Sequence, residues 1–463
     1  MEEKNTFENF VEHTIELAED KQFKRIRKEI IENGYNEADI AEILEDILEY
    51  VGISETIIVF RLLPKDVSVE VFSYLPSDDQ VKIINAITDK EIDYIIDELD
   101  FDDKIDVLEE LPANLVDKIL EKTPKNERKQ INTFLNYPED CAGTLMTPDY
   151  ISLEANMTVR QALDHIKKEG MDSETIYTCY VKSEGRKLEG IVSLKTLVIC
   201  DDDEIIGNLM HTDFIGINVY EDQEEVSEKF KKYGFLAIPV VDNENRLIGI
   251  ITVDDIFDVI EEEATEDIER MAGVIDGSDT EYLDMSVFKH VKNRLPWLFF
   301  LMCSYMITGG IITRFEASLS EVIALVAYMP MLMGTGGNSG SQSATLVIRS
   351  MSIGDINLKD AFRVIWKEFR IGIIIGITLS VFNFARIMIE QRGESNGILI
   401  AVTVCSAMIV VVVVAKTIGS MLPMLAKKLG IDPALMASPM ISSLTDTVSV
   451  ITYFLLAKVI LGI

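Results

Sequence analysis

Five long apolar stretches in the last third of the chain constrain its fold more than any other feature of the sequence. They are residues 296–313, 320–346, 370–389, 397–426 and 433–462. Each is long enough to cross a bilayer as a helix, since about 20 helical residues span a hydrocarbon core of roughly 30 Å. We therefore predict an α-helical membrane domain of five spans over residues 294–463, in a cell membrane.

The basic residues predict how these spans are oriented. Lys289, Lys292 and Arg294 precede the first span, and Lys427 and Lys428 precede the fifth. Four basic residues, Arg349, Lys359, Arg363 and Lys367, lie between the second and third spans, and Arg370 begins the third. Cytoplasmic loops are the ones enriched in lysine and arginine, so we expect a cytoplasmic N-terminus and an external C-terminus. The first residues, MEEKNTFENF, lack the basic and apolar regions of a secretory signal, which favours the same orientation.

The charge of the chain divides near the same point. Residues 291–463 contain 9 acidic and 14 basic residues, which leaves 69 of the 78 acids and 29 of the 43 bases in residues 1–290, a net charge of −40. A part this acidic repels phosphate backbones, so we expect no nucleic-acid partner. A solvated acidic surface is the ordinary explanation of such a composition, and a surface that requires counter-cations is the alternative.

Six successive units of twelve residues run from Pro64 to Leu135. Each opens with proline, threonine or aspartate and carries apolar residues toward its end. Proline at the first helical position and threonine or aspartate at a cap are helix-start signals, so each unit predicts one short helix. Such helices bury their apolar faces only against their neighbours. We predict an all-α acidic domain over residues 1–135 that forms a small superhelix.

A longer repeat occupies residues 136–260. Residues 145–166 resemble 209–230, and residues 180–197 resemble 239–256. Each copy has the order strand, helix, strand, turn, strand, helix, and the turn from Asp242 to Asn245 indicates a hairpin. The pattern resembles a tandem pair of CBS domains, so we predict an α/β module here. A helical connector over residues 261–293 then leads to the membrane domain.

Asp446 is an acidic residue near the middle of a predicted span, whereas Asp432 stands at the cytoplasmic end of the last one. An ionised carboxylate in hydrocarbon costs at least about 2.5–3.5 kcal/mol, so it requires a wet cavity, a partner or an ion. A buried ion pair with Lys416 is the structural explanation, and a cation path is the functional one, which we favour. Two such carboxylates across a twofold axis could hold one hydrated divalent ion. We therefore predict a homodimeric pore for Mg²⁺.

The second apolar stretch contains a polar, glycine-rich segment, MPMLMGTGGNSGSQSATL (329–346). Its glycines weaken a helix and its proline frees backbone carbonyls, and irregular backbone at membrane depth is tolerated only against protein or water. Close helix packing is the alternative, and Gly334, Gly337 and Gly340 fit it in part. We predict that the segment lines the pore, with close packing as a second role. The expected pore-lining residues are Pro330, Gly334, Gly337, Asn338 and Gln342.

Acidic side chains recur on single helix faces in two cytoplasmic runs, residues 97–106 and 253–267. In the second run, for example, Asp255 and Asp258 share one face. Like charges at this spacing destabilise a helix unless something neutralises them. We favour a metal sensor over a simply solvated surface. In such a sensor bound Mg²⁺ would hold the acidic domains together, and its loss would let repulsion separate them.

The order of these segments, together with five motifs, resembles the MgtE family of Mg²⁺ channels. The motifs are YPEDCAGTLMTPDY (137–150), DQEEV (222–226), VDDIFDVIEEEATEDI (253–268), GTGGNSGSQSATLVIR (334–349) and IDPALMASPMISSLTD (431–446). The resemblance implies a homodimer with a superhelical N domain, paired CBS domains, a connecting plug helix and five spans per chain. It also implies that Mg²⁺ closes the pore.

The resemblance further implies which residues bind the metal. Asp446 falls on the pore aspartate of the family, Ser442 on a backbone-carbonyl position one turn earlier, and Asp432 on an acidic position at the start of the last span. The implied sensor acids are Glu70, Asp102, Asp106, Glu224, Asp255, Asp258, Glu263, Glu266 and Asp267. The chain departs from the family at Gly234, where an aspartate is usual, and at Ser341, where an amide is usual.

An adenine nucleotide at the CBS pair is a further candidate ligand. The first copy has Thr196 where nucleotide-binding CBS domains carry a ribose-binding aspartate, whereas the second copy has Thr252 and Asp255. We expect no enzyme, since no P-loop or other ATPase signature occurs. The predicted function is a passive Mg²⁺ channel driven by the membrane potential. The alternatives are an ion-coupled secondary transporter of Mg²⁺ or Co²⁺, and a membrane-anchored nucleotide sensor.

Overall fold

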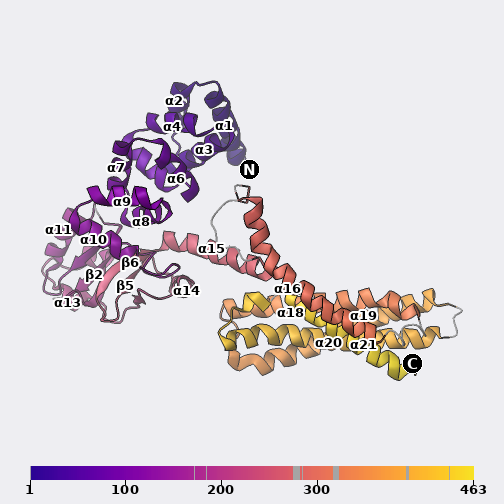
Figure 1. Cartoon of the computed structure of the whole chain (residues 1–463). Helices are drawn as coiled ribbons and strands as arrows, with labels where there is room; N and C mark the ends of the chain where they lie inside the picture. Colours follow the sequence, from indigo (N-terminus) through magenta and orange to yellow (C-terminus); the bar gives the residue numbers. More distant parts are fainter. Residues whose placement is uncertain are drawn as a thin grey trace. The chain divides into compact units, whose positions relative to one another are not determined.

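The twelve-residue units from Pro64 onward form one short helix each in the computed structural model of the chain (Figure 1). The helices of this region are α1 (Glu2–Glu19), α2 (Phe23–Asn33), α3 (Glu37–Tyr50), α4 (Ile53–Leu62), α5 (Lys65–Ser73), α6 (Ser77–Ala86), α7 (Asp89–Glu98), α8 (Phe101–Glu110), α9 (Ala113–Lys122) and α10 (Lys125–Phe134). Helices α4, α6 and α8 pack in succession, each against the next but one along the chain, and bury Ile83 and Ile105. The repeat prediction is confirmed, except that prolines such as Pro64 and Pro76 stand directly before the first helical residue instead of at it.

The structure describes residues 2–171, 173–183, 185–274, 282–283, 285–315, 323–392, 396–436 and 438–462. These residues form two compact units, Met1–Glu261 and Glu262–Ile463.

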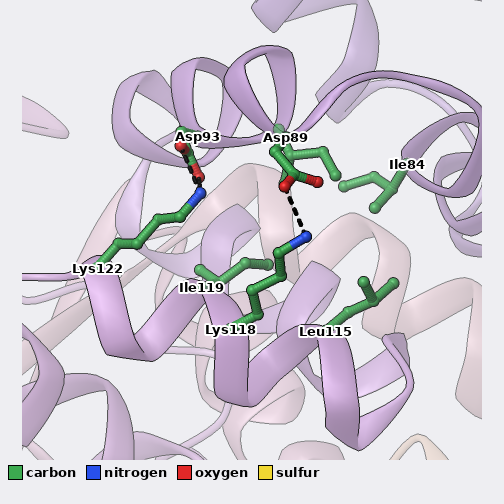
Figure 2. A pocket seen from close by; sticks show the side chains of 8 residues that line it. Ile84, Asp89, Asp93, Leu115, Lys118, Ile119 and Lys122 are labelled. Carbon is green, nitrogen blue, oxygen red and sulfur yellow. Dashed lines mark hydrogen bonds and ion pairs between the residues drawn. The ribbon is translucent and has the colours of Figure 1, made fainter.

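Two ion pairs connect α7 and α9 across the groove between them. Lys118 Nζ lies 2.7 Å from Asp89 Oδ2, and Lys122 Nζ lies 2.6 Å from Asp93 Oδ1. Figure 2 shows both lysines reaching over Ile119 toward the aspartates. Because these pairs are exposed, the burial of apolar side chains such as Ile119 contributes more to the packing of the two helices.

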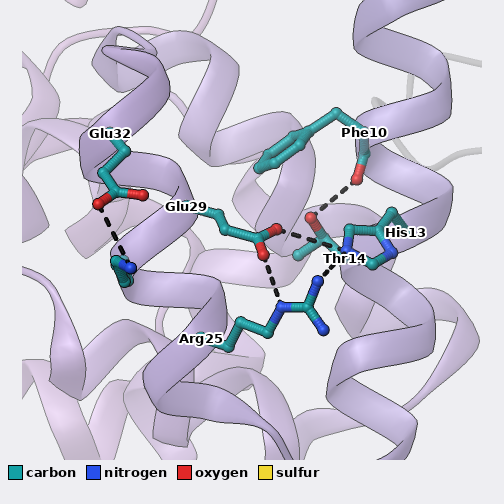
Figure 3. A network of polar contacts seen from close by, with 7 residues as sticks. Phe10, His13, Thr14, Arg25, Glu29 and Glu32 are labelled. Carbon is teal, nitrogen blue, oxygen red and sulfur yellow. Dashed lines mark hydrogen bonds and ion pairs between the residues drawn. The ribbon is translucent and has the colours of Figure 1, made fainter.

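A similar polar contact joins the first two helices. Arg25 Nε donates to Glu29 Oε1 at 2.6 Å, and His13 Nε2 of α1 lies 3.4 Å from Glu29 Oε2 of α2. In Figure 3 the side chains of His13 and Arg25 both point toward Glu29. The network therefore positions α1 against α2 at the surface.

The tandem α/β repeat has the element order that the sequence predicts. The first copy contains β1 (Tyr150–Leu153), α11 (Val159–Glu169), β2 (Thr175–Lys182), β3 (Leu188–Ser193) and α12 (Leu194–Ile199). The second contains α13 (Ile206–Leu209), β4 (Ile217–Asn218), α14 (Gln223–Tyr233), β5 (Ala237–Val241), β6 (Leu247–Thr252) and α15 (Val253–Ala272). In each copy the first two strands are parallel and the last two antiparallel. The predicted hairpin turn is present, with Asp242 Oδ1 accepting from the Arg246 N–H at 2.9 Å.

The two copies interlock through backbone pairing. Thr147, which precedes β1 of the first copy, pairs with β6 of the second, and His211, which precedes β4 of the second copy, pairs with β3 of the first. Glycine is required where these segments meet, because an added Cβ would lie 2.7 Å from the Thr147 carbonyl at Gly249 and 2.9 Å from the His211 carbonyl at Gly190. The repeat thus forms one module.

The second unit consists of long helices, of which α18 to α21 lie side by side (Figure 1). Its elements are α16 (Val287–Arg314), a 3₁₀ turn (Ile323–Tyr328), α18 (Met329–Ser352), a 3₁₀ turn (Leu358–Asp360), α19 (Ala361–Glu390), α20 (Gly397–Leu429), a 3₁₀ turn (Pro433–Met436) and α21 (Ser438–Leu461). Among the described residues, four segments are long and apolar enough to cross a membrane: Val287–Arg314, Leu358–Glu390, Gly397–Leu429 and Pro433–Leu461. The glycine-rich helix α18 is not among these four.

Several helix boundaries differ from the predicted ones. Pro296, expected just before the first span, lies inside α16. Helix α19 begins at Ala361 and therefore includes Glu368, which the predicted third span excluded. The predicted connector is not one separate helix: its first part continues α15 to Ala272, and its last part begins α16, while residues 275–281 and 284 lie outside the described residues.

Candidate metal and permeation sites

Asp446 and Ser442 lie one turn apart on α21, where this helix faces α18 and α16. Ser442 Oγ is 3.5 Å from Ser341 Oγ on α18. The Tyr305 hydroxyl of α16 lies close to the Asp446 carboxylate. Both Asp446 and Ser442 are half-buried. The two residues predicted to line the path therefore stand together on a partly open polar surface.

Lys416 does not neutralise this aspartate. Its ammonium lies 3.7 Å from Glu368 Oε2 and donates to Ser343 Oγ at 3.2 Å. The structural explanation for Asp446, an ion pair with Lys416, is therefore wrong. Glu368 was not predicted as a partner because it stands two positions before the predicted third span.

Helix α18 runs without interruption through its glycines, so the predicted irregular backbone is wrong. Pro330 lies in the first turn, where its missing N–H has no helical partner to lose. The glycines instead allow close approach: an added Cβ would lie 2.7 Å from Ile441 Cγ2 at Gly340 and 2.7 Å from Ser449 Oγ at Gly336. At Gly334, by contrast, no atom lies within 4 Å of an added Cβ. Close packing thus involves some of these glycines but not Gly334.

The predicted pore-lining residues occupy two faces of α18. Pro330, Gly334, Asn338 and Gln342 recur every four residues and form an exposed stripe within the single chain. Gly337 lies on the buried face, where an added Cβ would be 3.3 Å from Ser442 Oγ. Among the residues that the structure describes, this stripe is a surface that no other part of the chain covers.

A group of carboxylates from α5, α8 and its N-cap, α15 and the segment before β2 forms an acidic cluster in the first unit. The acidic cluster comprises Glu70, Asp100, Asp102, Asp103, Asp106, Glu174, Asp254 and Asp255. It brings together four predicted sensor acids with Asp103 and Glu174, which the sequence analysis missed. A helical-face pattern cannot identify Glu174, because the residue precedes a strand of the other domain.

Burial and mutual repulsion raise the pKa values of the acidic cluster. Burial, followed by repulsion from Asp103, raises the pKa of Asp102 to about 7. Burial also raises the pKa of Asp255 to about 7, although the Thr252 hydroxyl donates to its Oδ2 at 2.7 Å. Burial and the charge of Asp102 raise the pKa of Glu174 to about 8. These shifts mean that negative charge accumulates here only at a cost unless a cation joins the cluster.

The acidic cluster fits a hydrated cation better than a tightly ligated one. Asp102 Oδ1 is buried and has no hydrogen-bond partner among the described residues. Lys104 of the same helix pairs with Glu127 instead, at 3.1 Å. In the described parts of the chain, however, no three acidic, histidine or cysteine side chains converge closely enough to hold a metal ion directly. Mg²⁺ usually keeps several waters and needs only one or two carboxylates, so this donor set suits it.

A second set of predicted acids surrounds Arg270 of α15. Arg270 Nη1 donates to Asp432 Oδ2 at 2.6 Å, and the guanidinium also pairs with Glu266. The charge of Glu263 adds to this field and helps to raise the pKa of Arg270. Burial and the charge of Asp432 raise the pKa of Asp267. Here a side chain of the protein itself supplies the positive charge that the prediction assigned to a metal.

The remaining predicted acids lie on exposed helix surfaces. Glu224 stands in the first turn of α14, where its backbone N–H donates to Asp222 Oδ1 at 3.0 Å. Asp258 follows on α15, and burial and the charge of Glu261 raise its pKa. Gly234 ends α14 in the left-handed conformation at φ +67°, which favours glycine over the aspartate usual at this position.

Comparison with known proteins assigns three regions of the chain to families. The divalent cation transporter family MgtE matches residues 329–456, the MgtE intracellular N domain matches 35–140, and the CBS domain matches 142–201 and 206–262. The magnesium transporter MgtE of Thermus thermophilus is 38% identical over 334 residues, 72% of this chain and 73% of that protein. That of Bacillus subtilis is 37% identical over 335 residues, again 72% and 73%. A crystal structure of the cytosolic domain of the Mg²⁺ channel MgtE in complex with ATP covers 50% of this chain and 98% of that chain, at 31% identity and a TM-score of 0.45.

Proposed function

This chain belongs to the MgtE family of magnesium transporters, and on that premise we propose that it is a passive Mg²⁺ channel with a homodimeric pore that cytoplasmic Mg²⁺ closes. The membrane potential favours cation entry by about 2.3 kcal/mol per charge per 100 mV, so inward flow needs no coupled chemistry. In this proposal residues 1–135 and 136–260 sense Mg²⁺, residues 261–293 connect them to the pore, and residues 294–463 form it.

The observation that carries the proposal is the position of Asp446. Its carboxylate lies beside Ser442 and Tyr305, while the nearby cation Lys416 is engaged by Glu368. A carboxylate in a membrane domain that is not held by a basic side chain of its own requires water or an ion. A hydrated Mg²⁺ satisfies that requirement.

A second copy of the chain would complete the pore. One carboxylate is too little charge for a divalent ion, and a twofold axis would supply another. The exposed stripe of Pro330, Gly334, Asn338 and Gln342 on α18 supports a surface that faces water or a second copy of the chain. We include five spans, with α18 as the second, and a cytoplasmic N-terminus in the proposal.

The acidic cluster supports the proposed closure by Mg²⁺. It joins carboxylates of the all-α domain, such as Asp102 and Asp106, to carboxylates of the CBS pair, such as Asp255. Bound Mg²⁺ would relieve their repulsion and hold the two domains together, and its loss would separate them. An adenine nucleotide is a further proposed ligand of the CBS pair, supported by Thr252 and Asp255.

Mg²⁺ uptake into liposomes tests the proposal. The full-length chain should conduct Mg²⁺ without an imposed proton or Na⁺ gradient, and uptake should fall as internal Mg²⁺ increases. Asp446→Asn and Asp446→Ala should abolish uptake while the protein still folds. Normal uptake in either variant would refute the pore assignment, and uptake that requires a proton or Na⁺ gradient would favour a secondary transporter instead.

A further inference from the structure

A buried ion pair in the second unit is left unexplained by the permeation path. Glu368 of α19 is 8% exposed and Lys416 of α20 is 4% exposed, with Glu368 Oε2 and Lys416 Nζ 3.7 Å apart. Burying two charges costs free energy that their attraction repays only when further hydrogen bonds complete the geometry. The contacts that Glu368 and Lys416 make with other groups therefore decide whether the pair is stable.

The pair contacts the glycine-rich helix α18 through one hydroxyl group. Ser343 is fully buried, donates to Glu368 Oε2 at 2.5 Å and accepts from Lys416 Nζ at 3.2 Å. The hydroxyl thus donates a hydrogen bond to the carboxylate and accepts one from the ammonium group. Three helices meet at this point, and each contributes one of the three groups.

This contact lies next to a close approach between α18 and α20. One turn before Ser343, the carbonyl of Gly340 would be 2.2 Å from a Cβ added at Gly419, which follows Lys416 by one turn. One turn further back on α18, Gly337 faces Ser442 of α21. The ion pair and the predicted permeation residues are therefore connected through a few turns of one tightly packed helix.

Glycine contacts alone leave a helix free to rotate or slide, because small smooth surfaces pack in more than one register. A buried polar contact between the helices removes that freedom. Successive residues of a helix are about 100° apart, so a shift of α18 by a single residue would carry Ser343 away from the pair. Two buried charges would then lose a hydrogen bond, which makes the shifted register unfavourable.

We propose that Glu368, Lys416 and Ser343 are positioning residues of the permeation path, which set the register of α18 against α21. In that register Ser341 and Gly337 stand beside Ser442, one turn from Asp446. The inference rests on the proposed channel function for its consequence on flux, but the register itself can be measured independently.

Mg²⁺ flux through the full-length chain in liposomes is the first test, with Ser343→Ala as the variant. This change keeps the ion pair and removes its link to α18. We expect flux per folded protein to fall roughly threefold or more and the Mg²⁺ to Ca²⁺ flux ratio to change. The matched control is Ser380→Ala, because the Ser380 hydroxyl is also buried and donates to the Cys405 carbonyl of α20 at 2.9 Å, without α18 as a partner.

Disulfide formation between Ser341→Cys and Ser442→Cys measures the register directly, in a chain whose Cys303 and Cys405 are replaced by alanine. The two hydroxyl oxygens are 3.5 Å apart, so this pair should cross-link readily. The double change Glu368→Gln with Lys416→Met removes both charges together and leaves no lone buried charge. We expect it to reduce the cross-linking yield.

Two results would overturn the inference. One is unchanged cross-linking in the charge-free variant. The other is a Ser343→Ala protein whose flux and ion ratio match those of Ser380→Ala at equal melting temperature, since the triad would then have a structural role alone. If the unmodified chain carries no Mg²⁺ at all, the channel proposal fails, while the cross-linking result still decides the register.

Discussion

Nη1 of Arg270 lies 2.6 Å from Oδ2 of Asp432, so the end of α15 is bound by an ion pair to the segment that leads into the last helix. The same guanidinium pairs with Glu266, one turn earlier on α15. Glu266 and Asp432 are both predicted Mg²⁺ ligands. A tethered cation therefore occupies the place where a free one is expected, and we predict that the two compete for the same carboxylates.

Arg270→Gln tests this competition. Without the guanidinium, the acids around it repel one another and attract Mg²⁺ more strongly. We expect closure at a lower internal Mg²⁺ concentration, by roughly fivefold for about 1 kcal/mol of lost ion pairing. The measurement is Mg²⁺ uptake into liposomes as internal Mg²⁺ is varied. Arg246→Gln is the control, since Arg246 pairs with Glu244 in the β5–β6 hairpin. A need for more Mg²⁺ in Arg270→Gln would contradict the expectation.

Glu174→Gln tests whether the first CBS copy belongs to the acidic cluster. The change removes one negative charge from a site where burial and Asp102 raise the pKa of Glu174 to about 8. In Mg²⁺-free buffer we expect the folded state to gain roughly 1 kcal/mol, and the rise in melting temperature on adding Mg²⁺ should become smaller. Glu169→Gln is the control because Glu169 pairs with His165 on the exposed side of α11. An identical response in the two variants would remove Glu174 from the cluster.

The acidic cluster also predicts how stability depends on pH when Mg²⁺ is absent. The pKa values of about 7 for Asp102, 6 for Asp103 and 8 for Asp106 lie above the ordinary value of 3.8, so the folded state binds these protons more tightly than the unfolded state. The protonated carboxyl groups therefore contribute their full stability to the folded state below about pH 4. That contribution is lost as the pH rises through 6 to 8.

Thermal melting of the chain with a chelator present should therefore show a melting temperature that falls between pH 5 and pH 8. Added Mg²⁺ should flatten this slope, because the cation replaces the protons as the neutralising charge. A melting temperature that rises over the same pH range in the chelator would contradict the sign of the shifts.

Gly419→Ala tests the close contact between α18 and α20. The added Cβ would lie 2.2 Å from the Gly340 carbonyl, so the helices must separate. We expect a loss of about 1–3 kcal/mol, as for overpacked cores, with a lower melting temperature in detergent. Gly310→Ala on α16 is the control because no atom lies within 4 Å of its added Cβ. Equal melting temperatures for the two variants would show that the contact is dispensable.

Local patterns in the sequence were enough to predict most of the elements. The twelve-residue units predicted α5 to α10, and the internal repeat predicted the strands and helices of the CBS pair. Apolar stretches located the long helices, including the one that carries Asp446. Each of these signals is short-range: a cap, a turn or a periodicity acts within one or two turns of the chain.

Contacts between distant charges could not be predicted in this way. The sequence suggested Asp446 as a partner for Lys416, whereas in the folded chain Lys416 forms an ion pair with Glu368. It placed Asp102 and Asp255 on acidic faces but offered no sign that Glu174 joins them. The glycines of α18 suggested a broken helix, yet neighbouring helices close enough to touch them keep it whole.

The physical reason is that secondary structure follows from interactions among residues close in the chain. Their spacing can be read directly from the amino-acid sequence. The choice of ion-pair partner follows from the register and depth at which separate helices pack. The register and the depth of packing both depend on shape complementarity summed over many side chains. Residue order therefore specified the helices, strands and charged faces of this chain, and the folded arrangement specified which carboxylates face a lysine, an arginine or one another.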